Sequence, residues 1–198
     1  TQVFNAGLLG AKLLTLIYSE TNDQKLITEA KKIVAYVCKK QHEDGSWEYG
    51  TLPFHRWIDN FHTGYNLECI HVYQKFSNDL TFDSYVTKGL EYYLNTFFTD
   101  EGISKYYNNS IYPIDIHAPA QLVVTLSKLS VFQNNKQLVD KVLSWTIENM
   151  QDSKGFFYYQ KYKYTTCKIP YIRWAQSWMF YAFSYYAVEA NQGKISKF

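Results

Sequence analysis

A carboxylate and a histidine occur close together twice in this 198-residue sequence, each time just after an aromatic residue. The first group is Trp57, Asp59 and His62, and the second is Tyr112, Asp115 and His117. The two histidines are 55 residues apart, and amide side chains recur at that interval at Asn66, Gln121 and Gln176. Recurrence of the same polar types at one interval predicts equivalent places in a repeated structure.

These side chains are of the types that perform acid–base chemistry. Asp59 and Asp115 would be the two carboxylates of glycoside hydrolysis if both lay in one site, one as acid and the other as base or nucleophile. His62 and His117 would act as general bases near neutral pH, as an epimerase or a lyase requires. The alternative is architectural: each aspartate caps a helix, and each histidine bonds a neighbouring repeat.

We expect the substrate-binding residues beside these groups. An epimerase or lyase removes the proton next to a uronate carboxylate, and an arginine would neutralise the charge of that carboxylate. Aromatic rings stack on the apolar faces of sugars, while amides hydrogen-bond hydroxyl groups. The residues predicted to bind substrate are Arg56, Trp57, Tyr112, Arg173, Trp174 and Gln176. For Gln176, a structural tie between helices is the alternative.

Composition narrows the class of protein. The net charge is only +2, which gives no indication of nucleic-acid binding. No apolar run reaches the roughly 18 residues of a membrane span. Three isolated cysteines without a CxxC motif indicate a reducing compartment, and we expect a cytoplasmic protein. Because no cysteine cluster or His-x-x-x-His pair is present, we predict no metal site and no cofactor.

Apolar periodicity predicts seven helices and one short hairpin of strands. The predicted helices are 5–19, 24–41, 60–76, 81–98, 115–131, 136–150 and 172–190, and the hairpin is 157–164. Glycines at 45, 102 and 155 break the chain after the second, fourth and sixth helices. The first helix is apolar nearly all round, so we expect it to be buried on most sides.

Helices that follow a glycine break are apolar on nearly all sides, whereas those that precede one have a charged face. A repeat of about 55 residues with one buried and one half-buried helix predicts an all-α fold, an α/α toroid with inner and outer helices. We expect residues 1–198 to form a single domain of this kind or a fragment of one. Seven helices make an incomplete ring, so a second copy in a homodimer, or a missing N-terminal half, would cover the open edge.

Three stretches resemble the VpsJ-like polysaccharide-biosynthesis proteins, which are bacterial proteins encoded with exopolysaccharide and lipopolysaccharide genes. The stretches are Trp57-Ile58-Asp59-Asn60-Phe61-His62-Thr63-Gly64, Asp115-Ile116-His117-Ala118-Pro119-Ala120-Gln121 and Ile172-Arg173-Trp174-Ala175-Gln176-Ser177-Trp178-Met179. The resemblance spans about residues 57–186. It implies a six-hairpin-glycosidase-like α/α toroid and a place in the C-terminal half of a longer family member.

The resemblance and the acid–base residues together predict a carbohydrate-active protein of bacterial exopolysaccharide or lipopolysaccharide biosynthesis. It would act on a glycan by glycosidase-, lyase- or epimerase-like chemistry. The alternative is a non-catalytic toroid that binds a glycan or serves as a scaffold in a biosynthetic assembly. The enzyme prediction loses its basis if the two aspartates and two histidines all point into packed protein.

Overall fold

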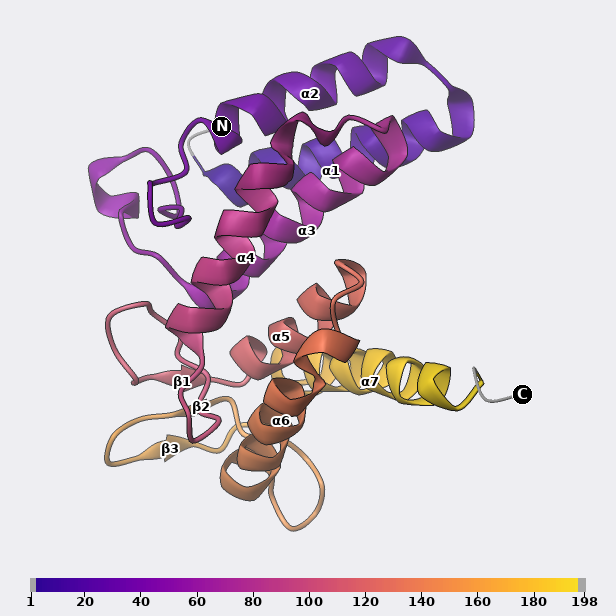
Figure 1. Cartoon of the computed structure of the whole chain (residues 1–198). Coiled ribbons are helices and arrows are strands. Elements are labelled where there is room, and N and C mark those ends of the chain that lie inside the picture. Colours follow the sequence, from indigo (N-terminus) through magenta and orange to yellow (C-terminus); the bar gives the residue numbers. More distant parts are fainter. Residues whose placement is uncertain (1–2, 196–198) are drawn as a thin grey trace. The chain divides into compact units, whose positions relative to one another are not determined.

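The computed structural model describes residues 3–195, and Figure 1 labels its elements. Within that range the fold is all-α, as predicted, with seven α-helices and one small antiparallel sheet. The chain forms two compact units, Thr1–Asn95 and Thr96–Phe198. Each unit contains one of the two acid–histidine groups, so each group is positioned by its own set of helices.

The first unit contains α1 (Phe4–Thr21), α2 (Gln24–Cys38), α3 (Asn60–Ser77) and most of α4 (Asp83–Phe97). Two single 3₁₀ turns, Pro53–His55 and Leu80–Phe82, precede α3 and α4. The helix α1 packs against both α2 and α3. In α2 the buried residues Ala30, Val34 and Val37 follow helical spacing, which is why this helix has one apolar face and one wet face.

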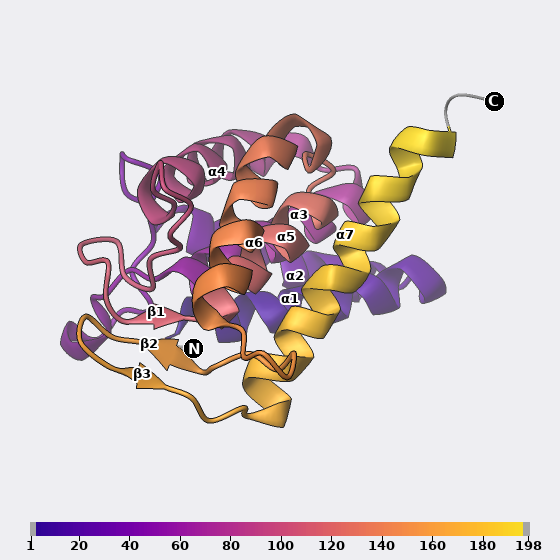
Figure 2. The same ribbon diagram turned by 90° about the horizontal axis from the view of Figure 1, so that it is seen from below.

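The second unit contains β1 (Ile114–Asp115), α5 (His117–Lys128), α6 (Lys136–Met150), β2 (Gln160–Lys161), β3 (Thr166–Cys167) and α7 (Ser177–Ile195). A 3₁₀ turn, Gln133–Asn135, precedes α6, and a π-helical turn, Ile172–Gln176, precedes α7. The strands form one antiparallel sheet in the order β1-β2-β3 (Figure 2). In this sheet Asp115 is opposite Gln160.

The predicted start of the fifth helix at Asp115 is wrong by two residues. Asp115 belongs to β1, and α5 begins at His117. The physical reason is pairing with β2, which holds Asp115 in an extended conformation beside Gln160. The predicted hairpin at 157–164 is confirmed in kind, although its paired strands lie slightly later, in β2 and β3.

The three predicted glycine breaks are turns of one geometry, which we call glycine turns. They are residues 42–46, 99–103 and 152–156. In each, the glycine N–H donates to the carbonyl three residues earlier, and that earlier residue's N–H donates to the carbonyl four residues later. Gly45, Gly102 and Gly155 all have φ near +90°, a conformation that side chains with a Cβ rarely adopt. The repeat inferred from the sequence is therefore present in the backbone.

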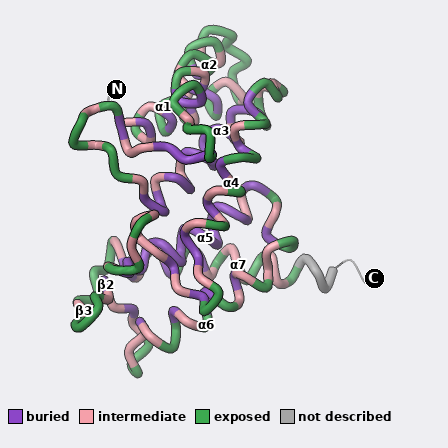
Figure 3. Tube along the Cα trace, turned by 60° about the vertical axis from the view of Figure 1, so that its left-hand side comes forward, coloured by how far each residue is buried: buried purple, intermediate pink, exposed green. Residues whose placement is uncertain are grey.

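Burial distinguishes the inner helices from one another. The helices α3 and α5 are buried on almost every side, and ten consecutive residues of α5 are buried (Figure 3). The prediction that the first helix is buried on most sides is wrong, because α1 buries a single face and leaves Leu13 59% exposed. In α7, Phe180 is 78% exposed. The described residues leave most of the Leu13 and Phe180 side chains uncovered.

Candidate functional site

Asp59 starts α3 in the first unit. Its backbone is extended, and its Oδ1 accepts a hydrogen bond of 2.9 Å from the backbone N–H of His62, as an N-cap residue does. Helical spacing then places the His62 side chain on the same side as the cap, one turn into the helix. The predicted capping role of Asp59 is confirmed by this contact.

The cap also brings three functional side chains together. Asp59 Oδ2 is 2.7 Å from His62 Nδ1 and accepts a 3.0 Å hydrogen bond from Trp57 Nε1. The Asp59 side chain is fully buried, whereas the His62 side chain is 21% exposed. Because a carboxylate only accepts hydrogen bonds, it holds the proton of His62 on Nδ1. The Nε2 atom of a neutral His62 is then the ring nitrogen with a lone pair.

Aromatic rings surround this pair. The Tyr49 ring stacks on Trp57 with centroids 4.5 Å apart and planes 16° apart, and it also lies 4.6 Å from the His62 ring. Trp57 remains 38% exposed. Trp57 is predicted from the sequence, whereas Tyr49 precedes it by eight residues in an irregular segment that carries no pattern. We call Tyr49, Trp57, Asp59, His62 and Tyr65 the Asp59 cluster.

Tyr65, the fifth member of the cluster, lies one turn further along α3, with its ring 5.9 Å from that of His62. Burial raises the pKa of Tyr65 well above its ordinary value, and the charges of Glu68 and Asp59 raise it further. Tyr65 therefore keeps its proton at neutral pH and can donate a hydrogen bond, but it is a poor base. Glu68 is itself buried and pairs with Lys12 of α1, which fixes its position.

Asp115 in the second unit is surrounded by hydrogen-bond donors. Its carboxylate accepts from Gln160 Nε2 at 2.6 Å, Trp174 Nε1 at 3.0 Å and the backbone N–H of His117 at 2.9 Å. The residue is 1% exposed. These contacts link β1, β2, α5 and the turn before α7. Asp115 therefore holds these segments of the second unit together, which is a structural role.

His117 lies between two tryptophans. Its ring is 4.6 Å from Trp174, edge to face, and 4.0 Å from Trp178, nearly parallel. The residue is fully buried, at the start of α5. Of the four residues predicted to be catalytic, Asp59, Asp115 and His117 therefore point into packed protein. His62 alone among them has a partly exposed side chain.

The remaining predicted substrate-binding residues are either exposed or tied to the backbone. Arg56 and Arg173 are both exposed, and the Tyr112 carbonyl accepts a hydrogen bond from Ser110. Gln176 accepts from the backbone N–H of Phe157 at 2.9 Å and donates to its carbonyl at 2.7 Å. The Gln176 side chain is thus a structural tie, although it joins a loop to the start of the last helix rather than two inner helices.

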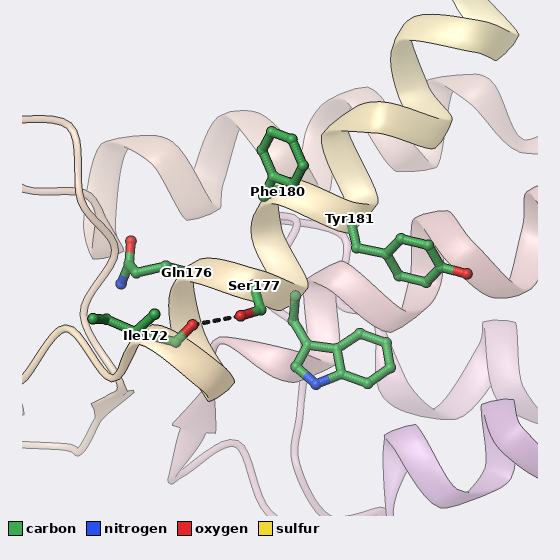
Figure 4. A pocket seen from close by; sticks show the side chains of 6 residues that line it. Ile172, Gln176, Ser177, Phe180 and Tyr181 are labelled. Atoms are coloured by element: carbon green, nitrogen blue, oxygen red, sulfur yellow. Dashed lines mark hydrogen bonds between the residues drawn. The ribbon is translucent and has the colours of Figure 1, made fainter.

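A broad cavity of about 660 Å³ lies on α7 of the second unit (Figure 4). Its lining consists of Ile172, Gln176, Ser177, Trp178, Phe180 and Tyr181. These side chains are mainly apolar, and none of them is a carboxylate or a histidine. The residues that line the cavity therefore offer no carboxylate or imidazole, unlike the Asp59 cluster.

Between residues 3 and 195, no three His, Cys, Asp or Glu side chains are grouped so that they could hold a metal ion. None of the helices in that range is long and apolar enough to cross a membrane.

The sequence matches no known protein family and no curated protein. Solved structures do resemble it. A glycosyl hydrolase of family 88 from Bacteroides vulgatus aligns with a TM-score of 0.67 and 10% identity, over 93% of this chain and 61% of that one. Cellobiose 2-epimerase from Bacillus thermoamylovorans aligns with a TM-score of 0.70 and 13% identity, over 93% and 53%. A polysaccharide lyase gives 0.70 and 11%, over 93% and 60%.

These likenesses establish the fold alone, because the identities are low. The chain spans between 53% and 61% of the length of these three structures. The predicted α/α-toroid class is confirmed by this structural similarity to glycosidase-like enzymes, and the chain corresponds to part of such a fold.

Proposed function

We propose that this chain is a carbohydrate-active α/α-toroid protein. In this proposal His62 transfers a proton to or from the glycan, and Asp59 holds the His62 ring in position. The observation that carries the proposal is the 2.7 Å contact between the buried Asp59 carboxylate and the partly exposed His62 ring. A histidine held in this way presents its other ring nitrogen to a ligand as base or acid.

This geometry favours epimerase- or lyase-like chemistry over hydrolysis by two carboxylates. Hydrolysis needs two carboxyl groups in one site. One protonates the glycosidic oxygen, and the other activates a water or attacks the anomeric carbon. Asp59 and Asp115 are both buried, and each accepts three hydrogen bonds from the protein. Removal of a proton from carbon needs one correctly placed base, and His62 supplies it.

The aromatic part of the Asp59 cluster is the proposed sugar platform. Tyr49 supports one face of Trp57, which fixes the ring while leaving the residue 38% exposed. A ring held rigid in this way binds a sugar face with little loss of side-chain entropy. The Tyr65 hydroxyl would donate a hydrogen bond to a sugar oxygen, because its raised pKa keeps it protonated.

The choice of glycan follows from the structural neighbours, whose names include an epimerase of cellobiose, an unsaturated glucuronyl hydrolase specific for heparin and a polysaccharide lyase. We define a glycan panel of cellobiose, an unsaturated glucuronyl disaccharide and a uronate-containing polysaccharide. We further propose a role in bacterial surface-polysaccharide biosynthesis, on the resemblance of the three helix entries to the VpsJ-like proteins. A glycan-binding role without catalysis is the second candidate, because the exposed Trp57 platform serves either function.

The test compares His62→Gln and Trp57→Ala with the unchanged protein on the glycan panel. We expect His62→Gln to bind the active glycan but to lose turnover. Loss of the Trp57 ring removes the platform and should weaken binding by about tenfold, the equivalent of about 1.4 kcal/mol. Trp57→Phe keeps a ring but loses the N–H, so it should bind more tightly than Trp57→Ala.

His71→Gln is the matched control, since His71 is on the same helix nine residues later and half a turn round from His62. Turnover that survives in His62→Gln would refute the acid–base role. Binding of a panel glycan without turnover in the unchanged protein would favour the second candidate.

A further inference from the structure

We call α2, α4 and α6, the helices that precede a glycine turn, the outer helices. The first two glycine turns each pack against the next outer helix along the chain. A Cβ added at Gly45 would lie 2.3 Å from the carbonyl oxygen of Lys88, in α4. One added at Gly102 would lie 2.7 Å from the carbonyl oxygen of Lys141, in α6. Lys88 and Lys141 each lie 14 residues before the glycine of their own repeat. The chain therefore makes the same turn-to-helix contact twice, once within each unit.

The third glycine turn lacks this partner among the described residues. Gly155 has φ +92° and the same turn hydrogen bonds, yet no described atom lies within 4 Å of a Cβ built on it. A glycine in this conformation is needed wherever the turn forms, but the open space beside it is particular to this turn. At the other two glycine turns, a helix carbonyl occupies the corresponding space.

The helix α2 corresponds to α4 and α6, but no glycine turn of the described chain packs against it. Lys31 lies 14 residues before Gly45, so it corresponds to Lys88 and Lys141, but the described chain has no glycine turn before α2. Tyr36 corresponds to Tyr93 of α4 by the same count. Tyr93 is fully buried, whereas Tyr36 is 46% exposed.

A cavity marks the vacant place on α2. It has a volume of about 390 Å³ and is lined by Phe4, Gly7, Lys32, Ile33, Tyr36 and Val37. In α4 the residue that corresponds to Lys32 is Gly89, and the ring of Trp47 from the preceding repeat packs against it. The cavity on α2 therefore lies where the preceding repeat would place its loop.

The inner helices show the same vacancy. Within the units, inner helices pack in pairs, α1 with α3 and α5 with α7. The outer flank of α1 is apolar but exposed at Leu9, Leu13, Leu16 and Ile17. The outer flank of α7 is likewise apolar but exposed at Phe180 and Val188, as is Ile172 in the turn before it. The cavity of Figure 4 lies on this flank of α7, and Gln176 joins it to Phe157, next to the third glycine turn.

We propose that a second copy of this chain fills these vacancies. The glycine turn 152–156 and α7 of one copy pack on α2 and α1 of the next, reproducing the contacts that turn 42–46 makes with α4 and that α5 makes with α7. We choose a second copy because the two surfaces are complementary. The chain has one glycine turn without an outer helix and one outer helix without a glycine turn, and it joins such surfaces twice internally. Such an interface joins two different surfaces, so it is head-to-tail.

The test uses two substitutions of exposed residues, one on each surface. Leu13→Glu places a charge on the α1 surface, and Phe180→Glu places one on the α7 surface. Sedimentation equilibrium at about 100 μM should show association of the unchanged chain and at least about tenfold weaker association of either variant. Tyr164→Glu, at an 85% exposed residue between β2 and β3, is the control and should associate normally.

An equimolar mixture of Leu13→Glu and Phe180→Glu distinguishes the head-to-tail arrangement. Each variant keeps the surface that the other has lost, so the mixture should form a heterodimer with one intact interface. A monomeric unchanged chain at about 100 μM overturns the proposal and assigns the vacancies to another polypeptide segment. Failure of the mixture to associate overturns the head-to-tail arrangement, provided that thermal unfolding shows both variants folded.

Discussion

Replacement of Asp59 by asparagine should move the proton of His62 from one ring nitrogen to the other. Asparagine caps helices as well as aspartate does, so α3 should still begin at the same place, with its Oδ1 accepting from His62 N–H. The change falls on Oδ2, which accepts from both Trp57 Nε1 and His62 Nδ1. An amide NH₂ at that place donates, so it requires His62 Nδ1 to be an acceptor and Nε2 to carry the proton.

The size of the effect follows from these contacts. A hydrogen bond to a carboxylate contributes about 2 kcal/mol, which favours the Nδ1–H form of His62 by about 30-fold. Removing the acceptor reverses that preference. Trp57 N–H also loses its acceptor and faces the amide NH₂ at the buried side chain, so the free energy of unfolding should fall by about 1–3 kcal/mol. A wrong tautomer of this kind lowers turnover by about 10⁴ in a serine-protease triad.

The assay is two-dimensional ¹H–¹⁵N NMR of the imidazole rings at about pH 8.5, where histidines are ordinarily neutral. His62→Gln assigns the His62 signals among those of the five histidines. The unchanged protein should show the Nδ1–H pattern, and Asp59→Asn the Nε2–H pattern. An Nε2–H pattern in the unchanged protein, or no change in the variant, would refute the positioning role of Asp59 without any knowledge of the substrate.

Two further predictions concern stability, measured by chemical denaturation. In the dissociated chain, Gly45→Ala should cost at least about 3 kcal/mol because its Cβ meets the Lys88 carbonyl. Gly155→Ala, with the same φ but open space within the single chain, should then cost only about 1 kcal/mol, and equal costs would contradict the packing argument. Asp79→Asn should cost about 1–2 kcal/mol at pH 7, because the hydrogen bond from Lys31 holds the pKa of Asp79 below its ordinary 3.8. A depressed pKa stabilises the folded state above that ordinary value and ceases to do so as pH falls through the folded-state value, so the cost should shrink below about pH 4. A cost of Asp79→Asn that does not change with pH would refute the stabilising role of the Lys31–Asp79 contact.

Local features of the fold could be predicted from the sequence because they depend on nearby residues. The glycine turns follow from single glycines after amphipathic helices, and the start of α3 follows from Asp59 three residues before His62. Helical geometry then brings those two side chains together without any tertiary information. The repeat interval supplied the fold class, since two alternating kinds of helix have few ways to pack.

Long-range contacts could not be predicted in this way. The pairing of Asp115 with Trp174, 59 residues later, and with Gln160 depends on how β2 and the last helix return to β1. Tyr49 lies in an irregular segment with no periodicity, so its stacking on Trp57 left no pattern to detect. The exposure of Leu13 was missed for a different reason: apolar residues on a helix show that it could be buried, but not whether a neighbour is there.

Incubation of the protein with the glycan panel in D₂O, followed by NMR, tests the central claim most directly. Proton transfer at carbon by His62 predicts a product with deuterium at the epimerised carbon or a new carbon–carbon double bond, and His62→Gln should form neither. Simple hydrolysis would release reducing ends with no deuterium on carbon. Hydrolysis, or an unaltered rate in His62→Gln, would contradict the assignment of His62 as the acid–base residue.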